Sequence, residues 1–69
     1  GLIVEYYTKG LDEVERRVRA LGLECSNLAY FIESESHVRL SFECNEAKVE
    51  ADVRREWKYL KVRMEVRGS

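Results

Sequence analysis

Residues 59–67 read YLKVRMEVR, and the conformation of this stretch decides the fold. Apolar residues occupy every second position from Leu60 to Val66, which is the pattern of a β-strand with one buried face. The same stretch also continues a series of apolar residues, spaced three or four apart, that begins upstream, and this spacing is the pattern of an amphipathic helix. That helical stripe consists of Val49, Val53, Trp57, Leu60 and Met64.

Turn chemistry favours the helix. No Gly, Pro, Asn or Ser lies between Glu46 and Arg67 to end a helix and begin a strand. Asn45 is a suitable N-cap, so we predict one terminal helix over residues 46–67, about 33 Å long at 1.5 Å per residue. The alternative is a strand over residues 59–66, which would complete a ferredoxin-like βαββαβ domain.

The segments upstream of this stretch are clearer. Residues 2–8 are rich in β-branched and aromatic residues and predict a strand. Apolar residues at helical spacing from Leu11 to Leu21 predict a helix that Gly22 closes as a C-cap. Residues 26–32 and 37–44 predict a hairpin around the polar turn at residues 33–36.

If that hairpin is centred on its turn, opposite residues have numbers that sum to 69. Ala29 and Phe31 then lie on the core face, and Leu28, Tyr30 and Ile32 lie on a partly covered outer face. Cys25 and Cys44 lie opposite each other on the core face, where a disulfide is geometrically feasible. No secretory leader is evident, so we expect a cytoplasmic location and two reduced thiols.

The predicted fold is a single α+β domain over residues 1–69, with β-α-β-β-α order, an antiparallel sheet and a long C-terminal helix. The chain has 45% hydrophobic and 36% charged residues, a composition typical of a globular domain. Its formal net charge of −1 argues against sequence-blind nucleic-acid binding. No apolar stretch is long enough to span a membrane, so no membrane association is expected.

No pattern in the sequence predicts catalysis. His37 is remote from both cysteines, and no CxxC pair occurs, so we expect neither a catalytic thiol nor a metal site. Glu33 and Glu35 lie in a solvated turn, and Gly10 stands outside any phosphate-binding motif, so we expect no enzyme activity and no cofactor.

The apolar residues on the second face of the predicted helix cannot reach the sheet that the main stripe covers, so they need another neighbour. Either the first helix covers this face or it is a partner interface, and we take it as the candidate interface. This interface consists of Ala51, Tyr59, Val62 and Val66.

The order of these elements, the third-strand sequence VRLSF at residues 38–42 and the apolar positions of residues 49–66 resemble the Pcc (CTAG/Pcc) family. Members of that family are small subunits of the KEOPS tRNA-modification complex. Val49, Glu50 and Arg54 stand where the family commonly has a Leu-Arg pair and an Asn, so the resemblance implies a divergent paralogue.

The resemblance implies a non-catalytic accessory or dimerisation subunit in the synthesis of threonylcarbamoyl-adenosine on tRNA. Its partners would be a second copy or a Pcc paralogue and the Kae-type subunit with the ATPase fold, and tRNA would be bound only weakly or indirectly. Two other readings are a ferredoxin-like regulatory domain that binds a small ligand and a designed scaffold without a native function.

Overall fold

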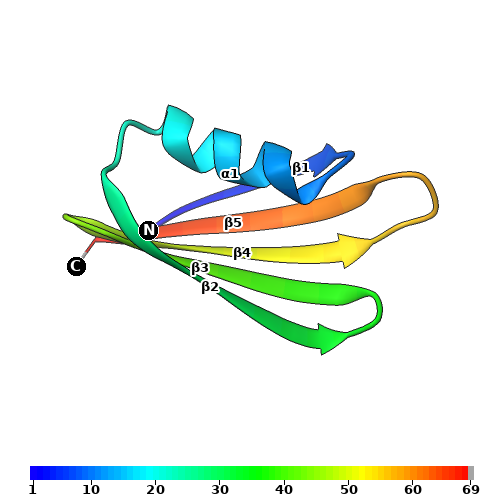
Figure 1. Ribbon diagram of the computed structural model, residues 1–69. Helices are drawn as coiled ribbons and strands as arrows, with labels where there is room; N and C mark the ends of the chain where they lie inside the picture. Colours follow the sequence, from blue (N-terminus) through cyan, green and yellow to red (C-terminus); the bar gives the residue numbers. More distant parts are fainter. Residues whose placement is uncertain (69) are drawn as a thin grey trace.

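The computed structural model describes residues 1–68, which form one antiparallel sheet with a helix across one face (Figure 1). The elements are β1 (Leu2–Thr8), α1 (Leu11–Ala20), β2 (Cys25–Ser34), β3 (His37–Cys44), β4 (Ala47–Arg55) and β5 (Leu60–Gly68). The five strands lie in the order β1-β5-β4-β3-β2, so β1 and β2 are the two edges of the sheet. The domain is therefore α+β, with one helix and five strands among the described residues.

The prediction of a long C-terminal helix is wrong, because β4 and β5 form a hairpin over this stretch. Apolar and charged residues alternate from Ala47 onward, and Ala47, Val49, Ala51 and Val53 are all buried. One sheet face hides all four side chains beside β3 and β5, whereas a helix would point them in several directions. The burial of apolar area outweighs the missing turn residues.

The β4–β5 turn forms without the Gly, Pro, Asn or Ser that usually occupies a tight turn. Its central residues are Trp57 and Lys58, and the Glu56 N–H donates a hydrogen bond to the Tyr59 carbonyl oxygen at 2.8 Å. No non-glycine residue in the described chain has a positive φ, so this turn closes without the left-handed backbone that favours glycine. The absence of Gly and Asn therefore did not exclude a hairpin.

The ferredoxin-like alternative is right about the last strand and wrong about the second helix. Its strand over residues 59–66 corresponds to β5, but its second helix is replaced by β4. Asn45, the predicted N-cap, lies in the connection between β3 and β4. There its backbone N–H donates a hydrogen bond to the Glu24 carbonyl oxygen at 2.9 Å.

The predictions for the first third of the chain are confirmed. β1 and α1 occupy the expected segments, and Gly22, just after the helix, has a φ of 77°. Helix α1 covers the sheet with Val14 and Val18, which are 0% and 1% exposed. Each fully buried valine contributes about 1.5–3 kcal/mol to folding. The part of the chain that the structure describes contains no helix long and apolar enough to cross a membrane.

The predicted register of the β2–β3 hairpin is right only at Cys25 and Cys44. Irregularities between Cys25 and Asn27 and between Ile32 and Ser34 each shift the pairing by one residue, so the rest of the hairpin is out of the predicted register. Leu28 therefore lies opposite Phe42, and Ile32 lies opposite Val38. The residues predicted for the outer face, Leu28, Tyr30 and Ile32, thus lie on the side of the sheet that α1 covers. A shift of one residue moves every side chain to the opposite face.

The expectation of two reduced thiols is also wrong for this structure. Cys25 and Cys44 are paired in the register, as predicted, and their sulfur atoms form a disulfide of 2.06 Å. The bond ties the first residue of the edge strand β2 to the last residue of β3.

Candidate functional site

The four residues predicted as a partner interface do not form one surface. Ala51 and Val62 are 0% exposed and lie in the core beneath α1, so neither can contact another chain while the domain is folded. Val66 packs partly against that core, and Tyr59, which is 47% exposed, follows the β4–β5 turn. The prediction placed them together on one helix, and that helix is absent.

Most of the exposed large apolar side chains lie on the two edge strands. Those on β1 are Leu2, Ile3, Val4 and Tyr7, and those on β2 are Tyr30, Phe31 and Ile32. Ile32 is 81% exposed, the highest value among the aliphatic residues of this group. Edge strands also leave every second backbone N–H and C=O group without a partner in the sheet, which makes them sites of association.

Strand β2 carries no charged residue from Cys25 to Ile32. Natural edge strands are commonly protected by charges, prolines or bulges. On β2, register irregularities occur only near the two ends, and the pairing from Asn27 to Ile32 is regular. The middle of this edge therefore offers an uninterrupted ladder of backbone groups beside apolar side chains.

Strand β1 differs from β2 because Glu5 stands at its centre. Glu5 lies opposite Arg63 of β5 on the face that α1 does not cover. A charge in the middle of an edge disfavours the approach of a second apolar strand. Of the two edges, β2 is therefore the better candidate for association.

Two polar contacts fix the aromatic side chains of β2. The Tyr30 hydroxyl donates a hydrogen bond to Glu15 Oε1 of α1 at 2.7 Å, and this bond raises the pKa of Tyr30 above its ordinary value of 10.0. On the opposite face, the Arg39 guanidinium lies 4.4 Å from the centre of the Phe31 ring. Both rings are thereby oriented beside the edge, which lowers the entropy cost of contacting a partner.

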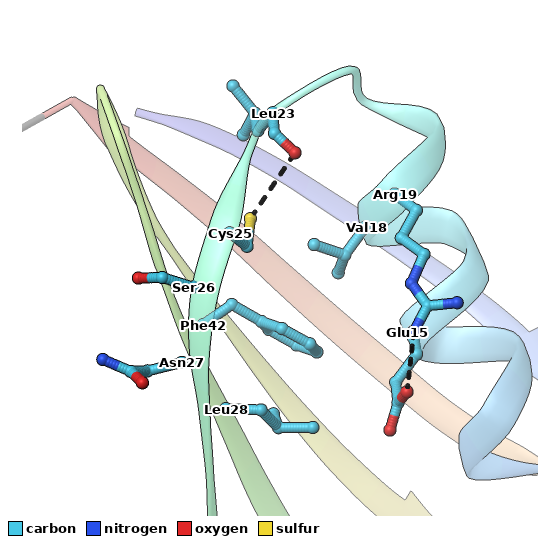
Figure 2. Close-up of a pocket in the computed structure, with 9 residues that line it drawn as sticks. All are labelled: Glu15, Val18, Arg19, Leu23, Cys25, Ser26, Asn27, Leu28 and Phe42. Carbon is cyan, nitrogen blue, oxygen red and sulfur yellow. Dashed lines mark hydrogen bonds and ion pairs between the residues drawn. The ribbon is translucent and has the colours of Figure 1, made fainter.

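A cavity of about 320 Å³ lies between the second half of α1 and the beginning of β2 (Figure 2). Val18, Leu28 and Phe42 point into it, and Glu15 and Arg19 stand at its helix side. The Arg19 guanidinium is 3.7 Å from Glu15, so the two charged groups at the cavity pair with each other. Nothing in this lining combines a nucleophile with a base.

The other side-chain contacts that could bear on chemistry lie far from the two cysteines. His37 Nε2 lies 2.7 Å from Asp52 Oδ1, but His37 and Cys44 are at opposite ends of β3, about 24 Å apart along an extended strand. Thr8 donates a hydrogen bond to Glu13 at the start of α1. Among residues 1–68, no group of three or more His, Cys, Asp or Glu side chains is placed to hold a metal ion.

Sequence reasoning missed this edge because it did not establish the order of the strands in the sheet. The run SNLAYFI at residues 26–32 was a usable signal, since a charge-free run on a strand favours a position in a core or against a partner. Which of these two applies depends on the position of β2 in the sheet, and the fold places it at the edge.

Comparisons with protein-family models, curated proteins and solved structures find no match to this chain.

Proposed function

We propose that this chain is a non-catalytic assembly domain that forms a homodimer by pairing β2 with β2 of a second copy. The observation that carries the proposal is the exposed, charge-free edge from Cys25 to Ile32, with Ile32 81% exposed. A strand of this kind gains both backbone hydrogen bonds and apolar contacts when it meets a second strand.

The pairing we propose is antiparallel, with a two-fold axis at Tyr30. In this register Ile32 lies opposite Leu28 of the second copy on the helix side of the sheet. Ala29 lies opposite Phe31 of the second copy on the other side, so a small residue meets a large one. No charged residue meets a like charge, and the contact is self-complementary, as a two-fold interface requires.

The same comparison of opposite residues disfavours a dimer through β1. An antiparallel pair centred on the middle of this seven-residue strand would place Glu5 opposite Glu5 of the second copy. Like charges directly opposite each other on neighbouring strands are destabilising. The proposed dimer therefore uses β2 and leaves β1 free.

The proposed role keeps one part of the family expectation, which is assembly through protein contacts. A place in a KEOPS-like complex, with a Pcc paralogue and a Kae-type subunit as partners, stays a prediction. The residues 49–66 that supported the resemblance lie in two strands here, so they no longer support it. The cytoplasmic location also stays a prediction, and in that compartment the Cys25–Cys44 disulfide would be kept reduced.

The test is the solution mass of the chain over a range of concentrations, measured by sedimentation equilibrium. We expect the wild type to approach twice 8.1 kDa at high concentration. The variant Ile32→Lys should weaken the dimer by about 2–3 kcal/mol over its two copies, which is about 30–150-fold in Kd. Because Ile32 is exposed, the monomer should keep its stability within about 0.5 kcal/mol.

The matched control is Ile3→Lys, which places the same residue at an exposed position of the other edge. We expect this variant to dimerise like the wild type. A wild type that remains at 8.1 kDa at high concentration contradicts the proposal, and so does a dimer that Ile3→Lys disrupts and Ile32→Lys does not.

A further inference from the structure

A second surface lies at the end of the sheet where β1 ends and the β4–β5 turn begins. Thr8 and Leu60 face each other in the register, which brings Tyr7 and Tyr59 to the same end of the molecule (Figure 1). Tyr7 is 60% exposed, Tyr59 is 47% exposed, and Trp57 at the tip of the turn is 91% exposed. Three exposed aromatic rings at one end need an explanation, because aromatic side chains normally bury most of their area.

Cations surround these rings. They are Lys9, Arg54, Arg55, Lys58 and Lys61, and we call this surface, together with Tyr7, Trp57 and Tyr59, the aromatic–basic end. None of the five has a salt-bridge partner within 4.0 Å in residues 1–68, whereas most other cations of the chain do. Carboxylates also lie near this end: Glu13, which Thr8 holds, Glu56, and Glu5, Glu35 and Asp52, which share cavity linings with the cations. None of them forms a salt bridge with the five cations within residues 1–68, so these ammonium and guanidinium groups are free to contact an anion, although the chain as a whole carries a formal charge of −1.

The cation pair on the two central strands is unfavourable in the free protein. Arg54 of β4 and Lys61 of β5 lie directly opposite each other on the face that α1 leaves open. Opposed like charges weaken a sheet, and an anion bound between them would remove the repulsion. A cavity of about 210 Å³ is lined by this pair, by Arg63 and by the carboxylates of Glu5 and Asp52, which both lie opposite Arg63 in the register.

The rings also border a larger hollow. Tyr7 and Tyr59 line an open cavity of about 700 Å³ with Thr8, Lys9 and Glu13. A planar heterocycle can stack on a tyrosine ring there while a neighbouring phosphate contacts Lys9 or Lys58. Stacking of a base on an aromatic ring contributes to binding without selecting the sequence, and cations beside the ring bind the backbone.

The chemistry of this end favours single-stranded nucleic acid over a lipid surface. Charged residues, Glu56 and Lys58, flank Trp57 at the tip, so no aliphatic side chain next to it in sequence would insert with it among lipids. Rings spread over two strand ends and a turn match several unstacked bases, which a duplex does not offer.

We propose that the aromatic–basic end binds single-stranded nucleic acid, with bases stacked on Trp57, Tyr59 and Tyr7 and phosphates bound by the surrounding lysines and arginines. The surface is separate from the proposed dimer interface, since β2 is the far edge of the sheet from β1. Both copies of a dimer would keep this end free, so the proposal stands or fails independently of dimerisation.

The experiment uses the fluorescence of Trp57, which is the only tryptophan of the chain. The full chain is titrated with single-stranded oligo(U) and oligo(dT) of about ten nucleotides at low salt, and the titration is repeated at higher salt. We expect quenching with both oligonucleotides, because the contacts involve bases and phosphates, and weaker binding as salt rises.

Two double variants in β4 and β5 serve as the test and its matched control. Arg54→Gln with Lys61→Gln removes the opposed cations at the aromatic–basic end, and Lys48→Gln with Arg67→Gln removes the opposed cations at the other end of the same strands. We expect the first variant to lose about tenfold in affinity and the second to lose less than about twofold. Circular dichroism checks that both variants fold.

Three outcomes would overturn the proposal. The first is that neither oligonucleotide quenches Trp57 fluorescence. The second is that the two double variants lose affinity equally. The third is a blue shift of Trp57 fluorescence with vesicles of anionic phospholipid and no response to oligonucleotide. Equal losses would mean that net charge alone attracts the ligand, and the vesicle response would assign this end to a membrane surface.

Discussion

Replacing Val62 by Ala tests the fold at the residue where the helix and the sheet differ most. Val62 is 0% exposed and lies between Tyr6 of β1 and Val53 of β4. The substitution removes two carbon atoms worth about 1.6 kcal/mol of transfer free energy, and the cavity left behind raises the loss to about 2–3 kcal/mol. A single core of this size supplies about 3–5 kcal/mol, so about half of the stability or more is lost.

The assay is urea and thermal unfolding followed by circular dichroism. For a domain of this size the expected loss lowers the Tm by about 10–20 °C. Val66→Ala is the matched control, because Val66 lies on the same face of β5 and is only partly buried, so it should cost less than about 1 kcal/mol.

Comparing Val62→Ala with Val66→Ala distinguishes the β4–β5 hairpin from the predicted terminal helix. In a terminal helix Val62 and Val66 would stand one turn apart on an outer face, and the two substitutions would have similar small effects. Equal losses for the two variants would refute the buried position of Val62. By the same reasoning Val62→Asp should unfold the domain, because it leaves an unpaired charge in the core.

Two further predictions concern the edge disulfide and Tyr6, a partly buried tyrosine whose hydroxyl is inaccessible. The double variant Cys25→Ala with Cys44→Ala should lose about 3 kcal/mol relative to the oxidised protein, from the 19-residue separation that the bond closes, and reductant should lower the urea midpoint of the wild type but not of the variant. Burial raises the pKa of Tyr6, and its hydroxyl has no hydrogen-bond partner among residues 1–68. The folded state therefore disfavours the tyrosinate, so this contribution to stability is present below the unfolded pKa of about 10 and is lost as the pH rises through the folded pKa. Tyr6→Phe should be as stable as the wild type at neutral pH and should lose less stability in urea unfolding above pH 10, and a clear loss at neutral pH would contradict the unpartnered hydroxyl.

The candidate surfaces show where sequence reasoning stopped. The net charge of −1 argued against nucleic acid, but it sums over a chain whose unpaired cations gather at one end. That clustering arises because the β4–β5 turn and the end of β1 meet in the sheet, although they are about 50 residues apart in sequence. Composition alone cannot report such an arrangement.

The edge at β2 shows the same limit. Its charge-free run is visible in the sequence, but the one-residue irregularity beside Cys25 reverses which of its side chains face α1. No residue pattern fixed that irregularity in advance. The helix of residues 11–20 was predictable because its apolar spacing fits only one period and a glycine follows it.

The sequence by itself determined β1, α1, the polar turn before His37 and the position of Cys25 opposite Cys44, since each rests on local periodicity or on a single hairpin, whereas the disulfide between these cysteines was not predicted. Only the tertiary structure decided the conformation of residues 46–67. That stretch satisfies the helical and the strand period at once, so local preference could not choose between them. The sheet wins because α1 and the neighbouring strands bury Ala51, Val53, Val62 and Met64 on one face, and a lone helix has no surface that could bury them all.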